Sequence, residues 1–501
     1  MRHLVVCCDG TWNTPEQEQV GVPTPTNVVR FYHALRDDAG QLRYYHPGVG
    51  TDPGLVDRLR GGGLGVGLSA NIKSAYSWLA KTYQPDDAIC LVGFSRGAYT
   101  VRSLAGMLWT CGLATTLASS PPETHWAEID RLYDEVYRPA RGRPTTRAPY
   151  PPVPIRFVGV WDTVGALGIP ETFGVLSLFD VEHRHRFHNT RLTPLIEHAR
   201  HAMALDETRG PFTPTLWTGG PALGENRSMR QVWFPGDHCD VGGGHLQTGL
   251  ADAALQWMIE EASACTGLRF RDDMLEQLRP NPADVLHDSC TGVYLHLAPA
   301  PRAVPLIDEQ NSFQVHPSVF ARRARPPVTV GQYRASHVLQ PGESASCQVY
   351  AGKAWNGTGL YLEEKGRYRF QADGEWLDRG IPIGPGGTRD GRFNPSEVFA
   401  LLGSFSGWLQ DRFRDLSGNE AADFLGAPRA TDAPWMALIG VIAAADVDDD
   451  GAQQPYQPLF IGPGCEHRVQ RPGYFYAYAN DAWGFYTNNK GSVTLAITRL
   501  R

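Results

Sequence analysis

The residue types that catalyse acyl transfer through a serine occur in one order along this chain: Ser95, Asp162 and His238. Ser95 is the centre of a Gly-x-Ser-x-Gly pentapeptide at residues 93–97. A serine becomes an effective nucleophile only beside a base, and an imidazole held by a carboxylate is such a base. We therefore predict a triad in which Ser95 is the nucleophile, His238 the base and Asp162 the acid that orients it.

Serine chemistry on an ester also requires N–H donors for the oxyanion that forms. The backbone N–H of Arg96, which follows the serine, is one predicted donor. The loop of Gly10 and Thr11, after the first apolar run, is the predicted source of the other. We expect the neighbouring Asp9 to hold this loop rather than to react.

Two of these assignments have competitors. Asp240 lies two residues after His238 and is a second candidate for the orienting acid, while Asp162 is also placed to cap a helix. Two other histidines are candidates for the base, His201 and His316. The order serine, acid, histidine is that of α/β hydrolases and favours Asp162 and His238.

Each candidate residue follows a short apolar run that indicates a buried strand, at residues 4–8, 88–92, 155–160 and 231–234. Helical patterns, such as residues 70–82, lie between the runs. Strands separated by helices predict a mostly parallel sheet with helices on both faces, like that of α/β hydrolases. The carboxyl ends of such strands share one edge, so the loops should converge there. The proline-rich and arginine-rich residues 121–154 predict an irregular excursion.

Five motifs in this order resemble the α/β-hydrolase family of type VI secretion phospholipase effectors: LVVCCDGTWN at 4–13, GFSRGA at 93–98, VWDTVG at 160–165, ALDET at 204–208 and VWFPGDHCDVGGG at 232–244. The resemblance covers residues 1–325 and implies the triad Ser95, Asp162 and His238. It also implies hydrolysis of phospholipid acyl esters and export as an antibacterial or anti-host effector. Partners implied are a membrane surface, the secretion apparatus and an immunity protein. Asp237 departs from the apolar or small residue usual beside the base.

Two other functions remain as alternatives to a phospholipase. One is an esterase that acts on acylated glycans. The other is a non-catalytic carbohydrate-binding protein on a hydrolase scaffold. Release of fatty acid from phospholipid, and its dependence on Ser95, distinguishes the three.

The sequence pattern changes after a basic, proline-containing segment at residues 322–327, which we interpret as a linker. From residue 328, apolar and polar stretches alternate with period two, which predicts an antiparallel β-sandwich. Residues 395–426 have helical spacing and predict a helical insertion. We predict domains at 1–327 and 328–501, with the boundary between 325 and 335.

The run of residues 480–492 places a carboxylate and several amides on one turn, and hard oxygen ligands of this kind suit calcium. The run resembles the ligand loop of calcium-dependent, galactose-binding bacterial lectins. That resemblance implies a carbohydrate ligand and a calcium site formed by Asp481, Asn488, Asn489 and the carbonyl of Phe485. A hairpin rich in Asn and Asp without metal is the alternative.

Composition excludes some functions. Lys and Arg number 46 against 53 Asp and Glu, for a net charge of -7, so nucleic acid is not an expected partner. The nine cysteines follow no metal-ligand spacing and indicate reduced packing residues. The first residues lack the apolar region of a signal peptide, and the apolar runs are too short to span a bilayer. We expect synthesis in the cytoplasm and export by the type VI route.

Overall fold

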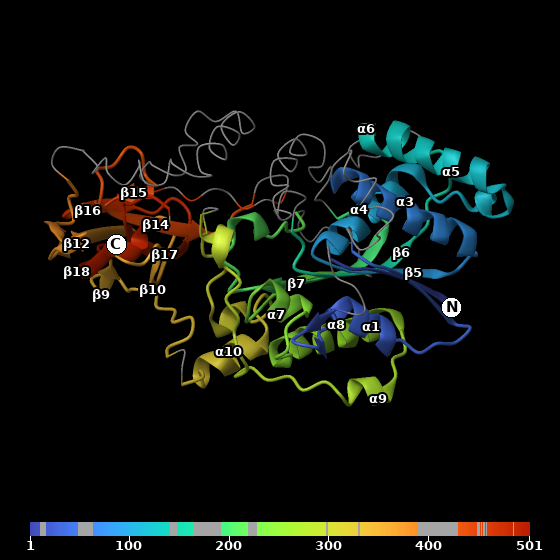
Figure 1. Cartoon of the computed structure of the whole chain (residues 1–501), viewed down its shortest axis with the longest axis horizontal. Coiled ribbons are helices and arrows are strands. Elements are labelled where there is room, and N and C mark those ends of the chain that lie inside the picture. Colours follow the sequence, from blue (N-terminus) through green and yellow to red (C-terminus); the bar gives the residue numbers. More distant parts are fainter. Residues whose placement is uncertain are drawn as a thin grey trace.

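The computed structural model describes residues 1–10, 17–48, 64–140, 148–164, 192–218, 228–296, 299–328, 331–388, 429–447 and 451–501, apart from 452, 454–455, 457 and 484. A parallel sheet covered by helices forms the first part of the chain, and antiparallel sheets form the second (Figure 1). The predicted fold class is confirmed. Among the described helices, none is both long and apolar enough to cross a membrane.

The first part is built on a six-stranded sheet in which all neighbouring strands run parallel. Its order is β4 (Gln41–His46), β1 (His3–Cys8), β5 (Ala88–Phe94), β6 (Ile155–Trp161), β7 (Ile196–Ala204) and β8 (Ser228–Phe234). The chain runs from β1 to β4 on one side and then to β5 on the other. Open α/β sheets form their sites where the strand order reverses in this way, here between β1 and β5.

The sheet is buried on both faces because successive side chains of a strand point in opposite directions. In β1, Leu4 and Val6 contact one hydrophobic cluster, while Val5 and Cys7 contact another. One face is covered by α3 (Leu64–Thr82), α4 (Arg96–Cys111) and α5 (Pro122–Arg131). The other is covered by α1 (Asn27–Ala34) and α8 (Gly249–Thr266). Figure 1 shows these two helical layers above and below the strands.

The prediction of an irregular excursion at residues 121–154 is wrong for the first half of that segment, which is helical. Helix α5 continues through η2 (Leu132–Tyr137), a π-helix, into α6 (Arg138–Ala140). Pro122 stands in the first turn of α5, where a missing N–H costs nothing. Ile129 and Leu132 are buried in the core beside α4, so packing holds the helix together.

The second part of the chain has two antiparallel sheets with a shared core. One sheet contains β10 (Asn356–Leu362), β17 (Gly473–Ala479), β14 (Leu438–Ala444) and β15 (Pro458–Phe460). The other contains β13 (Ile381–Ile383), β12 (Trp376–Asp378), β18 (Asn489–Arg499), β11 (Arg367–Asp373) and β16 (Gly464–Arg468), with β9 (Ser344–Tyr350) also paired to β18. The helical insertion predicted at 395–426 lies outside the described residues.

The two parts of the chain share a hydrophobic cluster. Leu205 and Trp233, at the end of the parallel sheet, pack with Tyr474 and Tyr476 of β17. The segment interpreted as a basic linker begins within α10 (Pro317–Ala324), where Arg322 is fully buried and donates hydrogen bonds to two backbone carbonyls. The boundary at 325–335 stays a prediction.

Candidate active site

Ser95 lies at a sharp turn between β5 and α4. Its backbone has φ 56° and ψ -120°, a strained conformation for a residue with a side chain. The motif glycines are required by close packing: a Cβ on Gly97 would lie 2.0 Å from the carbonyl oxygen of Cys8, and one on Gly93 would lie 2.5 Å from that of Gly97. This is the strand-turn-helix geometry of a nucleophile elbow.

The candidate base, His238, begins helix α7 (His238–Gly242), and residues 235–237 connect it to the end of β8. Its Nδ1 lies 2.6 Å from Oδ2 of Asp162, and both side chains are buried. The imidazole ring also lies 4.5 Å, centroid to centroid, from the ring of Phe94, the residue before Ser95. His238 is therefore beside the elbow, with Nδ1 bound to the acid. Within the described residues no hydrogen bond joins it to Ser95, and such bonds often tighten only when substrate binds.

Asp162 follows β6 and also has a positive φ, of 36°. Arg302 donates two hydrogen bonds of 2.6 and 2.9 Å to its carboxylate, and the N–H of Ala204 donates a third of 2.9 Å. Burial opposes ionisation, but the charge of Arg302 and the hydrogen bond from His238 outweigh it and hold the pKa of Asp162 well below its ordinary value. Asp162 is therefore a carboxylate at neutral pH. Nothing in the sequence marks Arg302, which lies 140 positions away.

The competing acid, Asp240, has a different partner. Its Oδ1 lies 2.6 Å from Nδ1 of His287, and its Oδ2 accepts the N–H of His287 at 3.0 Å. Of the two candidate acids, the structure places only Asp162 against His238.

The competing bases, too, have structural partners. His201 accepts the N–H of Thr163 through Nε2 at 3.1 Å, and burial lowers its pKa to about 3. His316 caps α10 by accepting the N–H of Ser318, and burial lowers its pKa to about 4. Both imidazoles are therefore neutral at neutral pH, and each accepts a hydrogen bond from a backbone N–H.

The ALDET motif holds the loop that carries His238. Asp206 accepts the N–H of Gly236 at 2.8 Å, and Glu207 accepts the N–H of His238 itself at 3.3 Å. Asp237 caps α7 by accepting the N–H of Asp240 at 2.8 Å. The sequence showed this motif only as part of a resemblance. Its carboxylates fix the backbone around the candidate base.

The structure bears differently on each residue predicted to form the oxyanion hole. Asp9 accepts the N–H of Gly10 at 2.7 Å and the hydroxyl of Thr26 at 2.7 Å, so it fixes the end of β1. The Gly10 N–H is thus engaged by Asp9 in this structure. Thr11 lies outside the described residues. Arg96 begins α4, where the first N–H groups have no acceptor within the helix.

The four predicted calcium ligands follow β17 in the sequence, and the structure joins them in two contacting pairs. Asp481 accepts a hydrogen bond of 2.7 Å from the side-chain amide of Asn489. The remaining side-chain oxygen of Asn489 is buried and has no hydrogen-bond partner among the described residues. Phe485 precedes the short helix η8 (Tyr486–Asn488), and its carbonyl accepts the N–H of Asn488 at 3.3 Å. A buried carboxylate beside an unbonded amide oxygen fits an oxygen-binding cation.

Comparison with known protein families shows a match to a family model. The model is described as the catalytic domain of Tle1-like phospholipase effectors of the type VI secretion system, and it matches residues 2–261. The matched residues include Ser95, Asp162 and His238.

Among curated proteins, an uncharacterized protein of Saccharomyces cerevisiae is 28% identical over 261 residues, which is 48% of this chain and 36% of that protein. An uncharacterized Pseudomonas aeruginosa structure is 19% identical with a TM-score of 0.33, covering 56% of this chain and 49% of that one. A Tle1 effector bound to the VgrG spike of the type 6 secretion system is 20% identical with a TM-score of 0.27, covering 48% and 51%. This chain spans about a third of the yeast protein and about half of either structure.

A PllA-like lectin, the N-terminal domain of EclA, is 14% identical with a TM-score of 0.18. The match covers 31% of this chain and 94% of the lectin domain. Its likeness to this chain is therefore confined to a minor share of the sequence.

Proposed function

The chain belongs to the family of Tle1-like phospholipase effectors of the type VI secretion system through its catalytic domain, and on that premise we propose that it hydrolyses phospholipid acyl esters with Ser95 as the nucleophile. The observation that carries this proposal is the 2.6 Å contact between His238 and Asp162 beside the positive-φ turn of Ser95. A serine, an oriented imidazole and a buried carboxylate are the groups that acyl transfer needs.

In the proposed reaction, Nε2 of His238 takes the hydroxyl proton of Ser95 as Oγ attacks the ester carbonyl. The tetrahedral intermediate collapses to an acyl-serine, and the imidazolium returns the proton to the departing alcohol. Water then attacks the acyl-serine with the same base, releasing the fatty acid. The N–H groups of Arg96 and the loop after β1 are the proposed donors to the oxyanion.

Asp162 has the role of holding the Nδ1–H of His238 and stabilising the imidazolium. Arg302 has a positioning role, because its two hydrogen bonds fix the carboxylate and keep it ionised. These interactions offset the desolvation free energy of the buried Asp162 carboxylate already in the substrate-free protein.

The test is fatty-acid release from vesicles of phosphatidylethanolamine and phosphatidylglycerol, measured by mass spectrometry. Ser95→Ala should lower the rate by about 10³-fold or more, as loss of a triad nucleophile does. Ser312→Ala is the matched control, since Ser312 is exposed and should leave the rate unchanged. Equal rates for wild type and Ser95→Ala would remove Ser95 from the reaction.

One observation favours the glycan esterase as a second candidate. A cavity of about 410 Å³ is lined by Arg209 and Arg302 near the triad and by aromatic residues of the second part, Trp355, Tyr478 and Trp483. Aromatic faces stack well on sugar rings. Activity on acetylated glycans that requires Ser95, with silence on phospholipid vesicles, would identify this function. Silence on both would favour the non-catalytic carbohydrate-binding protein.

We also propose that calcium binds the second part of the chain, at Asp481, Asn489, Asn488 and the carbonyl of Phe485. The unbonded oxygen of Asn489 supports this site. Excess calcium should raise the melting temperature, since a ligand at 100 times its Kd stabilises by about 2.7 kcal/mol. Asp481→Ala should abolish the shift, while Asp373→Ala, at the end of β11, should keep it. An unchanged melting temperature in the wild type would count against a site.

Family membership further supports type VI secretion and a partner in the secretion apparatus as proposals for this chain. Co-purification of the intact chain with a spike protein of a type VI secretion system tests that partner. An immunity protein should suppress the Ser95-dependent toxicity of the chain in a susceptible cell. Toxicity that persists in Ser95→Ala would separate the toxic effect from hydrolysis.

A further inference from the structure

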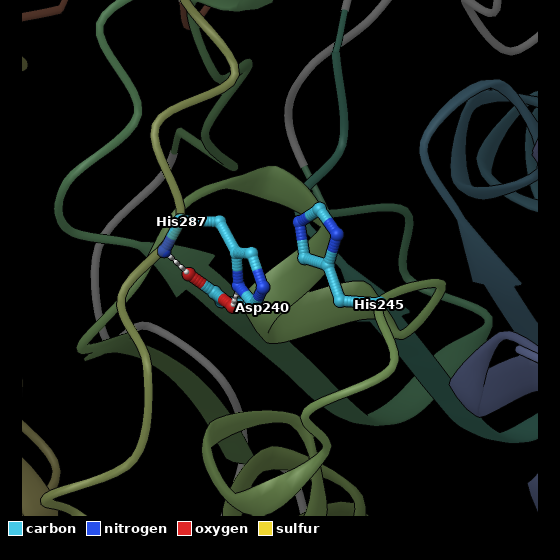
Figure 2. A group of neighbouring side chains, drawn as sticks. All are labelled: Asp240, His245 and His287. Carbon is cyan, nitrogen blue, oxygen red and sulfur yellow. Dashed lines mark hydrogen bonds and ion pairs between the residues drawn. The ribbon is translucent and has the colours of Figure 1, made fainter. Parts of the chain in front are cut away.

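A second group of ionisable side chains surrounds α7 without taking part in the proposed reaction. It consists of Asp237 and Asp240 on the helix and its cap, His245 after the helix, and His287 from a distant loop. Figure 2 shows Asp240, His245 and His287 close to one another. We call these four residues the α7 cluster. His238 lies on the same helix, but its partner is Asp162 and it belongs to the proposed triad.

The α7 cluster is closely packed. Nδ1 of His287 lies 2.6 Å from Asp240, and Nε2 of His245 lies 3.2 Å from Asp237. The two imidazole rings stack with centroids 3.8 Å apart and an interplanar angle of 17°. One possible ligand atom from each of Asp240, His245 and His287 lies within 4.8 Å of the others. Three donors from two separate segments therefore face a common point.

The α7 cluster differs in charge from several other buried carboxylates of the structure. Asp162 forms an ion pair with Arg302, Glu207 with Arg209 and Asp252 with Arg30. Asp237 and Asp240 are 2% and 1% exposed, and across the described part of the chain their ion-pair partners are histidines alone.

The two imidazole rings stack with centroids 3.8 Å apart beside these two buried carboxylates. A divalent cation supplies two positive charges, and it takes neutral imidazole and carboxylate as ligands. The arrangement therefore fits a metal ion.

We propose that Asp240, His245 and His287 bind a divalent transition-metal ion of the zinc type. Nitrogen and oxygen donors in this combination suit zinc. Zinc bonds of about 2.0–2.2 Å place ligand atoms roughly 3.4 Å apart. Binding therefore lengthens the 2.6 Å contact between Asp240 and His287 and draws the more widely separated donors, which lie within 4.8 Å, closer together. Asp237 holds the His245 ring by a hydrogen bond, the usual support for a metal-bound histidine.

Such an ion joins the loop of His287 to α7, and α7 also carries His238. The imidazoles of His245 and His287 are 17% and 21% exposed, which gives an ion from solvent a path to the site. Binding displaces the proton between Asp240 and His287. The ion acts as a cross-link that stabilises the loop around the candidate base, and it takes no part in the proposed hydrolysis.

The test is zinc titration of the metal-free intact chain by calorimetry, with calcium present throughout to saturate other oxygen sites. The wild type should bind one zinc ion at the α7 cluster, and His245→Gln and His287→Gln should each weaken the affinity by tenfold or more. His337→Gln is the matched control, because His337 also pairs with a carboxylate but lies elsewhere and is 55% exposed. It should keep wild-type affinity. Wild-type affinity in both cluster variants would overturn the proposal.

Cobalt provides a second readout that does not depend on the variants folding well. Cobalt bound by histidine and carboxylate in the wild type should show intense visible absorption, which the hydrated ion lacks. A wild-type spectrum identical to that of hydrated cobalt would overturn the proposal. Both measurements apply equally to Ser95→Ala, so their outcome is independent of the proposed hydrolase activity.

Discussion

Helix α7 carries members of two Asp–His pairs that look alike and differ in charge. His238 lies 2.6 Å from Asp162, and two residues later Asp240 lies 2.6 Å from His287. The first pair is deeply buried and its carboxylate is neutralised by Arg302. The second reaches the surface through His287, and within the described residues no arginine or lysine forms an ion pair with it. The charge around a pair, more than its internal distance, decides what chemistry it can support.

The largest expected effect comes from breaking the first pair. Asp162→Asn keeps the shape of the side chain but favours the wrong tautomer of His238, and it should lower kcat by about 10⁴-fold. Asp240→Asn is the matched change in the second pair. It should abolish zinc binding and lower the rate far less. Equal losses of activity in the two variants, assayed on the same vesicles, would contradict the assignment of Asp162.

Removing Arg302, the positive charge that only the first pair has, should have the next largest effect. Arg302→Gln leaves the buried Asp162 carboxylate without its arginine and should lower the free energy of unfolding by about 3–5 kcal/mol. Urea denaturation measures the change. Arg138→Gln, which breaks an exposed pair with Asp134, should cost less than about 1 kcal/mol.

The same substitution should change the pH dependence of stability. The folded-state pKa of Asp162 is depressed, so its stabilising contribution is present above the unfolded pKa of about 3.9 and is lost as the pH falls through the folded value. Without Arg302 the folded pKa rises, and the loss should begin at a higher pH. Identical stability profiles for wild type and Arg302→Gln would show that Arg302 does not control this carboxylate.

The smallest expected effect concerns His316, an imidazole that pairs with no carboxylate among the described residues. Burial lowers the pKa of His316 to about 4, below the unfolded value of about 6.5. Its contribution to stability is therefore complete above pH 6.5 and is lost as the pH falls toward 4, by at most about 1.4 kcal/mol per pH unit. His316→Asn keeps a capping acceptor and should make the decline between pH 6.5 and 4.5 shallower. Melting temperatures across that range test it, and parallel curves would contradict it.

The sequence predicted those parts of the fold that depend on local pattern. Four of the six parallel strands coincide with the apolar runs noted in the sequence. β7 was not predicted, because its residues Ile196–Ala204 are mostly alanine, histidine and charged residues without β-branching. It is a strand because β6 and β8 pair with it on both sides. Position within the sheet outweighs intrinsic preference there.

By itself the sequence determined the elbow of Ser95, because the spacing of Gly93 and Gly97 is a local requirement of a strand that turns tightly into a helix. It also placed an acid and a histidine after later strands, in the order of a hydrolase. Only the tertiary structure decided that Asp162, and not Asp240, contacts His238. It alone brought Arg302 to the acid and His287 to α7. Such pairings join residues far apart in the chain, and only the packing of the whole sheet sets their distances.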